Sequence, residues 1–226
     1  MEAAWIALAL SLKVAAWSTL ITLLLGVALG LYLARTTNRL SGLLDALLTL
    51  PLVLPPTVLG YYLLVVIGRK GPIGAWLDEV AGITLVFTWQ GAVIAAAVVS
   101  LPLVVKAARS AFEAVDGQLE QAARVLGLGE AALFSRVTLP LAWRGVLAGV
   151  LLAFARAFGE FGATLMVAGS IAGETQTMSI AVYEAVQAGQ DDVANWLVLI
   201  LTATCVLVLL LAQRLQPARS GGPGGV

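Results

Sequence analysis

Residues 113–140, EAVDGQLEQAARVLGLGEAALFSRVTLP, are the only long interruption of an otherwise apolar chain that combines many charges with strong helix formers. Asp116 can cap a helix N-terminus, and Glu120 then lies early in that helix, where a negative charge suits the helix dipole. Gly127 provides a C-terminal stop, and Glu130 opens a second helix. We therefore predict two short helices joined by a hinge and docked at a membrane surface.

Helical spacing predicts which side of the first short helix is apolar. The residues expected on the apolar face are Leu119, Ala122, Ala123 and Leu126. The polar residues expected to point away from that face are Glu120, Gln121 and Arg124. At the end of the stretch, Pro140 suits the first turn of whatever helix follows.

The composition is that of an integral membrane protein. Hydrophobic residues make up 60% of the 226 and charged residues 12%, about half the level usual in soluble domains. The mean hydropathy is +0.97, and a chain of this kind crosses the bilayer as α-helices. The net charge of zero gives no footprint for nucleic acid.

The residue types also exclude several chemistries. The chain has no histidine, and Cys205 is its single cysteine, so we expect no disulfide, no His/Cys metal site and no Ser/His/Asp catalytic set. It has no phosphate-binding Gly-x-x-x-x-Gly-Lys-Ser/Thr motif either. We expect no catalytic residue, cofactor or metal on this chain, and any energy for pumping must come from a partner or an ion gradient.

Five stretches are long enough to cross a bilayer, which takes about 20 residues. They are Val14–Ala34, Gly42–Ile67, Ile83–Val105, Gly145–Gly169 and Val193–Ala212. The first can extend back through residues 5–12 and is too long for a cleaved signal peptide, so we expect it to stay as a membrane helix. Prolines in the second must kink or break it, which leaves room for a sixth short helix: Pro51, Pro55 and Pro56.

We predict one transmembrane domain over residues 1–214 and a flexible tail over residues 215–226. The positive-inside rule places the basic loops in the cytoplasm, with the N-terminus outside and the C-terminus inside. Their basic residues are Arg35, Arg39, Lys106, Arg109, Arg124, Arg136, Arg144, Arg214 and Arg219. Residues 170–192, which we expect outside, carry four acidic residues and no Lys or Arg, and the loop with Arg69 and Lys70 also carries Asp78 and Glu79.

The fourth stretch contains the most unusual membrane residues. If it is one helix, Arg156, Glu160 and Thr164 lie along one row, a turn apart. Intramembrane charges are costly and often functional, so the row is a candidate for the translocation path. The alternative is an ion pair that locks two helices together without touching cargo. Glycine pairs at 26/30 and 145/149 are expected to let helices pack closely.

The loop resembles the cytoplasmic coupling loop of ABC importer permeases. The resemblance rests on Gln121-Ala122-Ala123, Gly127 and the run Val137-Thr138-Leu139-Pro140. The family pattern begins Glu-Ala-Ala; here Gln121 replaces that Glu, and Glu120 sits one residue earlier. The resemblance implies that Glu120, Gln121, Ala122, Ala123, Gly127, Val137, Leu139 and Pro140 belong to an element that inserts into a groove on an ATP-hydrolysing subunit. An amphipathic helix resting on lipid is the alternative.

Three further motifs resemble the permease subunit of molybdate importers. They are LPLVLPPTVLG at 50–60, GEFGAT at 159–164 and IAGETQT at 171–177. The motif GEFGA is shared with sulfate and thiosulfate permeases, and it adds Gly159, Phe161 and Gly162 to the path candidates.

The resemblance implies a polytopic helical bundle of five or six spans in a prokaryotic cytoplasmic membrane. It further implies a homodimer that takes molybdate or tungstate from an extracytoplasmic binding protein, with ATP and Mg²⁺ bound by the partner ATPase. The alternatives are a sulfate or thiosulfate permease, a stand-alone secondary transporter or channel that uses Arg156 and Glu160 as a relay, and a membrane scaffold.

Overall fold

The computed structural model describes residues 2–36 and 38–215, and every regular element within them is helical. The helices are α1 (Glu2–Arg35), α2 (Arg39–Val53), α3 (Pro56–Ile67), α4 (Pro72–Ala81), α5 (Trp89–Glu113), α6 (Gly117–Val125), α7 (Glu130–Leu133), α8 (Leu139–Phe158), α9 (Gly162–Ala168), α10 (Met178–Gln187) and α11 (Asp191–Leu215). One π-helical turn, Phe134–Thr138, joins α7 to α8. The predicted tail covers residues 215–226. Leu215 is the last residue of α11, and residues 216–226 lie outside the described residues.

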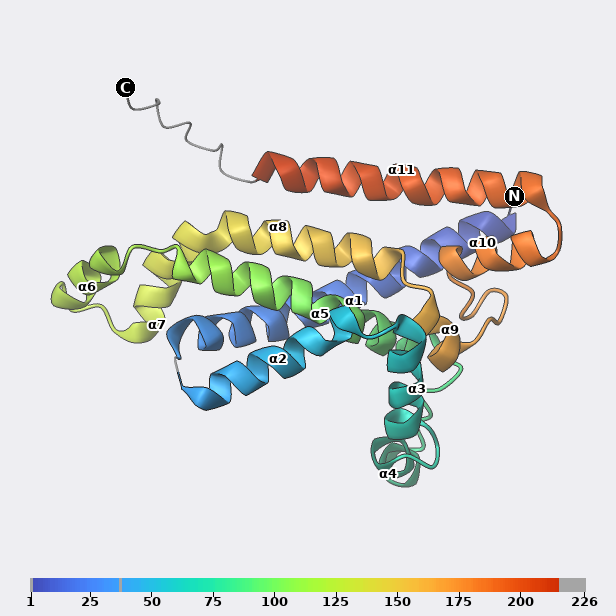
Figure 1. The fold of residues 1–226 in the computed structure, drawn as a ribbon, viewed down its shortest axis with the longest axis horizontal. Coiled ribbons are helices and arrows are strands. Elements are labelled where there is room, and N and C mark those ends of the chain that lie inside the picture. The colour runs from blue at the N-terminus through green and yellow to red at the C-terminus, as the bar shows by residue number, and fades with distance from the viewer. Residues whose placement is uncertain (1, 37, 216–226) are drawn as a thin grey trace.

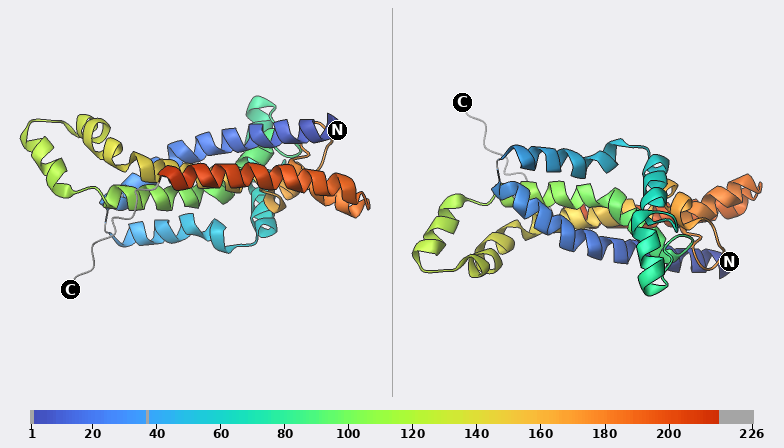
Figure 2. Two further views of the ribbon diagram at one scale, coloured as in Figure 1. Left: turned by 90° about the horizontal axis from the view of Figure 1, so that it is seen from above. Right: turned by 90° about the horizontal axis from the view of Figure 1, so that it is seen from below.

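The long helices α1, α2, α5, α8 and α11 run along the long axis of the molecule (Figure 1). The α6–α7 segment lies at one end, and α9, α10 and the N-terminal end of α1 lie at the other. Helices α3 and α4 project sideways from the bundle, and two further views show the same arrangement (Figure 2). The segment that interrupts the apolar sequence therefore lies at one extremity of a helical bundle.

Helix α5 packs between α1 and α8 through glycine contacts. A Cβ added to Gly30 of α1 would lie 2.7 Å from the Cβ of Ala108. On the other side, a Cβ added to Gly149 of α8 would lie 2.3 Å from that of Ala107. Both distances are too short for real Cβ contacts, so only glycine allows these helices to approach so closely. The predicted packing role of the two glycine pairs is confirmed.

The number of spans agrees with the sequence. Within the described residues, four helical segments are long and apolar enough to cross a membrane: α1, α5, α11 and the continuous segment Glu130–Phe158. The bent pair α2 and α3 makes a fifth if it is one broken span, and its two parts are inclined by 116°. The break falls between Pro51 and Pro56, where the prolines predicted it.

The third span begins later than predicted. Residues 83–88 are not helical, and α5 begins at Trp89 and continues to Glu113. Thr88 caps this helix, because its hydroxyl oxygen accepts a hydrogen bond of 3.1 Å from the backbone N–H of Gly91. The apolar residues before Thr88 were wrongly included in the helix because hydropathy does not distinguish an apolar loop from an apolar helix.

The prediction of a continuous helix over Gly145–Gly169 is wrong. Helix α8 begins at Leu139 and ends at Phe158, and residues 159–161 separate it from α9. Glycines on both sides of this break, Gly159 and Gly162, are the sequence signal that could have located it. The break changes the environment of Arg156 and Glu160.

Candidate functional site

The turn chemistry of the predicted coupling loop is confirmed. The Asp116 carboxylate accepts a hydrogen bond of 2.8 Å from the N–H of Gln118 and caps α6. Gly127 has a φ of +84°, in the left-handed region that favours glycine, and the N–H of Leu128 donates to the carbonyl of Ala123. A second helix begins at Glu130, as predicted.

That second helix is not a separate short one. Helix α7 continues through the π-helical turn into α8, so the segment from Glu130 to Phe158 forms one span candidate. In the π turn the N–H of Leu139 donates to the carbonyl of Phe134. The wider turn carries the helix across Pro140, which has no N–H to donate. The hinge at Gly127 therefore joins one short helix to a membrane span.

Most of the apolar face predicted for α6 is exposed, and a carboxylate lies on its buried side. Glu120 is only 2% exposed, whereas Leu119 is 50% and Leu126 is 80% exposed. Val125 is 87% exposed as well. Helical spacing groups residues correctly into faces, but it assumes that the apolar face is the buried one. Here α6 turns a carboxylate inward and leaves apolar side chains uncovered.

Three hydrogen bonds explain why Glu120 is buried. Arg35, the last residue of α1, donates from Nη1 to Oε2 at 2.5 Å and from Nη2 to Oε1. Thr138, in the π turn, donates from its hydroxyl to Oε1 at 2.6 Å. The bonds from Arg35 hold the pKa of Glu120 below its ordinary value, and Thr138 lowers it further, although burial opposes both. Arg35 is 85 residues away in sequence, so no local pattern indicated this contact.

A second ion pair crosses the Gly127 turn. Arg124 donates from Nε to Oε1 of Glu130 at 2.7 Å and from Nη2 to Oε2 at 3.2 Å. The Glu130 side chain is 75% exposed. An exposed pair of this kind contributes little to stability because water screens it, so it makes a useful control for the buried one.

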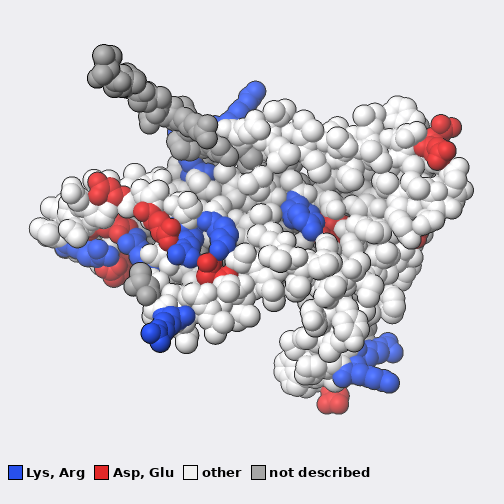
Figure 3. Space-filling view, viewed as in Figure 1, with Lys and Arg blue, Asp and Glu red and all other residues white. Residues whose placement is uncertain are grey.

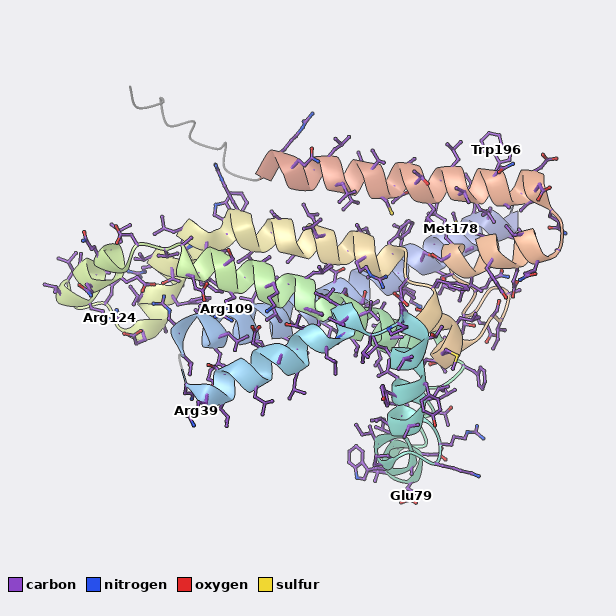
Figure 4. The ribbon with its side chains drawn as sticks, viewed as in Figure 1. Arg39, Glu79, Arg109, Arg124, Met178 and Trp196 are labelled. Carbon is purple, nitrogen blue, oxygen red and sulfur yellow. The ribbon has the colours of Figure 1, made fainter. Side chains whose placement is uncertain are left out.

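The loop end of the bundle carries a network of charges (Figure 3). Lys106 of α5 donates to Asp45 of α2 at 2.7 Å, and Arg109 lies 3.2 Å from the same carboxylate. Figure 4 shows Arg109 and Arg124 toward this end, with Met178 and Trp196 toward the other. These ion pairs connect α2 to α5 close to the candidate loop.

The second candidate site lies at the break between α8 and α9. Arg156 Nη1 is 2.5 Å from Oε2 of Glu160, whose side chain is 1% exposed. The other carboxylate oxygen, Oε1, accepts a hydrogen bond of 2.9 Å from the N–H of Ala163 in the first turn of α9. The expected pairing of Arg156 with Glu160 is confirmed. The expected continuation of the same helical row to Thr164 is wrong because the helix ends at Phe158.

Close contacts hold the break in place. A Cβ added to Gly162 would lie 3.0 Å from Pro56, and one added to Gly60 would lie 2.6 Å from Met166, so α3 and α9 pack tightly. The Phe161 ring lies 5.1 Å from that of Tyr183 in α10. Two of the candidate path residues, Gly162 and Phe161, therefore connect the break to α3 and α10.

Residues 26–220 match the family described as the binding-protein-dependent transport system inner membrane component. The chain belongs to this family. It is a multi-pass membrane permease component of an ABC transporter, and members of this class transport rather than catalyse.

The curated relatives carry a more specific description. The chain is 47% identical over 221 residues to the molybdenum transport system permease protein ModB of Escherichia coli K12, covering 96% of both chains. It is 45% identical to ModB of Haemophilus influenzae, over 93% of this chain and 92% of the relative. A probable molybdenum ABC transporter permease of Haloferax volcanii is 40% identical, over 91% of this chain and 73% of the relative.

Solved ABC transporters share the fold. The inward-facing MetNI methionine transporter matches with a TM-score of 0.68 at 18% identity, over 94% of this chain and 92% of that one. A bacterial alginate transporter, in complex with a periplasmic protein bound to an alginate pentasaccharide, matches with a TM-score of 0.74 at 14% identity, over 92% and 76%. At these identities the likeness concerns the arrangement of helices.

Proposed function

We propose that this chain is the permease subunit of an ATP-driven importer whose cargo is molybdate, with tungstate accepted as a close chemical analogue. The observation that carries the proposal is 47% identity over 96% of both chains to a molybdenum transport permease. Molybdate and tungstate are both tetrahedral dianions, so a path built for one accommodates the other.

The energy comes from a separate ATPase subunit that binds ATP and Mg²⁺ and docks at the coupling loop. The docking element comprises Glu120, Gln121, Ala122, Ala123, Gly127, Val137, Leu139 and Pro140, of which Glu120 and Ala123 are buried against the permease itself. The exposed apolar side chains of α6 support this role, since Val125 and Leu126 are 87% and 80% exposed. Apolar side chains presented together at one end of the molecule suit a protein partner. The permease works as a homodimer and receives cargo from an extracytoplasmic binding protein.

The coupling loop faces the cytoplasm, with the N-terminus outside and the C-terminus inside. The charge distribution supports this orientation. Lys and Arg gather at the loop end together with acidic partners, whereas an acidic patch lies at the other end (Figure 3), where α11 begins with Asp191 and Asp192. In a Cys205→Ala background, Asp191→Cys should react with an impermeant thiol reagent applied outside intact cells, and Glu130→Cys should not. The reverse labelling pattern would overturn the orientation.

The translocation path passes the break between α8 and α9, where Arg156, Gly159, Glu160, Phe161, Gly162 and Thr164 are the candidate residues. The Arg156 side chain is 33% exposed, so its guanidinium is accessible to a passing dianion. Glu160 is buried and would repel the same dianion, which assigns it to gating or structure instead of cargo contact.

The test is uptake into proteoliposomes that contain the permease, its ATPase and the binding protein. We expect ATP-dependent molybdate uptake that excess tungstate inhibits and excess sulfate does not. Uptake abolished by sulfate but unaffected by excess molybdate would assign the cargo to sulfate instead. Uptake that follows an ion gradient without any ATPase would replace the importer with a secondary transporter.

A further inference from the structure

Helix α6 is attached to the rest of the protein mainly by one carboxylate. Of its nine residues only Glu120 and Ala123 are buried, and Ala123 has no polar group in its side chain. The helix is bounded by Asp116 on one side and by the Gly127 turn on the other. Besides Glu120, α6 is held by the buried Ala123 and by the exposed Arg124–Glu130 pair, which water screens.

The Glu120 carboxylate connects three elements at once. It lies on α6, accepts both hydrogen bonds of the Arg35 guanidinium at the end of α1, and accepts a third from Thr138 in the turn that leads into α8. A bidentate arginine–carboxylate pair fixes direction as well as distance. One side chain, Glu120, therefore fixes the position of the loop relative to α1 and α8.

We propose that Arg35, Glu120 and Thr138 form a latch that holds α6 in one orientation, so that displacement of the coupling loop moves α1 and α8 together. The proposal rests on the proposed function, in which the loop receives the ATPase. Glu120, Arg35 and Thr138 are then positioning residues for transport.

The packing of the bundle supports this role. Helix α5 packs against both α1 and α8 through glycine contacts, and α1 and α8 also touch each other, so these three helices resist sliding past one another. A displacement of Glu120 therefore acts on this packed group through two contacts, Arg35 on α1 and Thr138 before α8. The Arg35 side chain is 42% exposed, so its charge is partly solvated and the latch fixes geometry more than it adds stability.

The first test uses the isolated permease and needs no cargo. Spin labels at Val125→Cys on α6 and Tyr32→Cys on α1, in a Cys205→Ala background, report the distance between the two helices. We expect one narrow distance distribution that broadens in Glu120→Ala. Glu130→Ala removes the exposed carboxylate from the same loop and should leave the distribution narrow.

A second variant protects the test against misfolding. Arg35→Gln combined with Glu120→Gln removes both charges, so it leaves no unpaired Arg35 guanidinium, and the glutamine at position 120 fills the space of the original side chain; this variant should fold even if Glu120→Ala does not. The distribution should broaden in this variant too. A narrow distribution in either folded variant would overturn the latch.

The functional readout is the number of ATP molecules hydrolysed per molybdate imported by the full complex. A coupling free energy of ordinary size corresponds to a rise of at least about fivefold in this ratio for the double variant, with the control unchanged. A broad distribution with an unchanged ratio would overturn the proposal. If the wild-type complex imports no molybdate, the cargo assignment fails, and the distance measurement still decides on the latch.

Discussion

Two carboxylates are buried among the residues that the structure describes, and their hydrogen bonding differs. Glu120 and Glu160 are each 2% exposed, and each lies beside an arginine whose side chain is a third or more exposed. Both oxygens of Glu120 accept well-aligned hydrogen bonds. In Glu160 only Oε1 does, because Oε2 is close to Arg156 but has no aligned hydrogen-bond partner among the described residues.

The difference separates a fixed contact from an exchangeable one. A buried polar atom without an aligned partner costs free energy, and another donor can relieve that cost. Glu120 would gain no hydrogen bond from a new partner, as expected for a contact that transmits movement of the loop. Oε2 of Glu160 would gain a hydrogen bond from a new donor, as expected for a residue that changes partners beside the proposed path. The predictions below test this contrast.

The largest effect is expected at the break. Arg156→Gln leaves Glu160 as a buried, unpaired charge, which typically costs about 3–5 kcal/mol, whereas Arg156→Gln with Glu160→Gln leaves none. The single variant should unfold at a lower temperature in detergent than the double variant. Arg124→Gln, which breaks an exposed pair, is the control and should shift the unfolding temperature little.

Uptake measurements then distinguish the two roles of this pair. A double variant that is stable but transports nothing would place the pair on the path itself. If Arg156→Gln is as stable and active as the unmodified chain, Glu160 does not depend on Arg156, and the contrast with Glu120 fails.

The sequence predicted those parts of the molecule that depend on neighbours in the chain. Asp116 and Gly127 act locally, and the break between α2 and α3 falls at Pro55 and Pro56, so these features were identified correctly. The burial of Glu120 depends on Arg35, which folding brings from 85 residues away. Rules based on helical spacing relate residues only three or four positions apart, so they cannot predict this contact.

The row from Arg156 to Thr164 failed for another reason. Four-residue spacing predicts a shared face only while the helix continues, and the Gly159 region ends it. Arg156 and Glu160 still pair, because they flank the helix end closely enough for the carboxylate to reach the guanidinium. Thr164 lies in α9, after the break, so it does not share a helix face with Arg156.

The next largest effect concerns the turn that carries α6. Gly127→Lys forces a side chain into a φ of +84°, at a cost of about 1–3 kcal/mol. We expect the permease to insert normally but to retain its ATPase about 5- to 150-fold more weakly if all the strain falls on docking. Gly129→Lys is the matched control, because Gly129 has a φ of −72° and open space around it. Equal ATPase retention by the two variants would contradict the docking role of this turn.

A smaller effect is expected from the third partner of Glu120. Thr138→Val removes one hydrogen bond of three and should lower stability by about 1 kcal/mol. Thr138→Ser keeps the hydroxyl and should behave like the unmodified chain in both thermal unfolding and the α1–α6 distance measurement. If the serine variant is impaired and the valine variant is not, Thr138 acts through packing of its methyl group instead of through its hydrogen bond to Glu120.

The last prediction concerns the protonation of Glu120, which should have the smallest effect near neutral pH and is the most specific to this residue. Hydrogen bonds from Arg35 and Thr138 hold the pKa of Glu120 below its ordinary value of 4.5, and the charge of Arg124 adds to this. A carboxylate whose folded-state pKa is depressed stabilises the fold fully above its ordinary pKa. That contribution is lost as the pH falls through the ordinary pKa toward the lower pKa of the folded state.

The α1–α6 distance distribution should therefore stay narrow from about pH 7 to about pH 5 and broaden only in more acidic buffer. In Glu120→Gln the distribution should not change with pH, while Glu130→Gln should keep the profile of the unmodified chain. Acid broadening that persists in Glu120→Gln would assign the transition to another carboxylate, and the contrast between a fixed Glu120 and an exchangeable Glu160 would lose its basis.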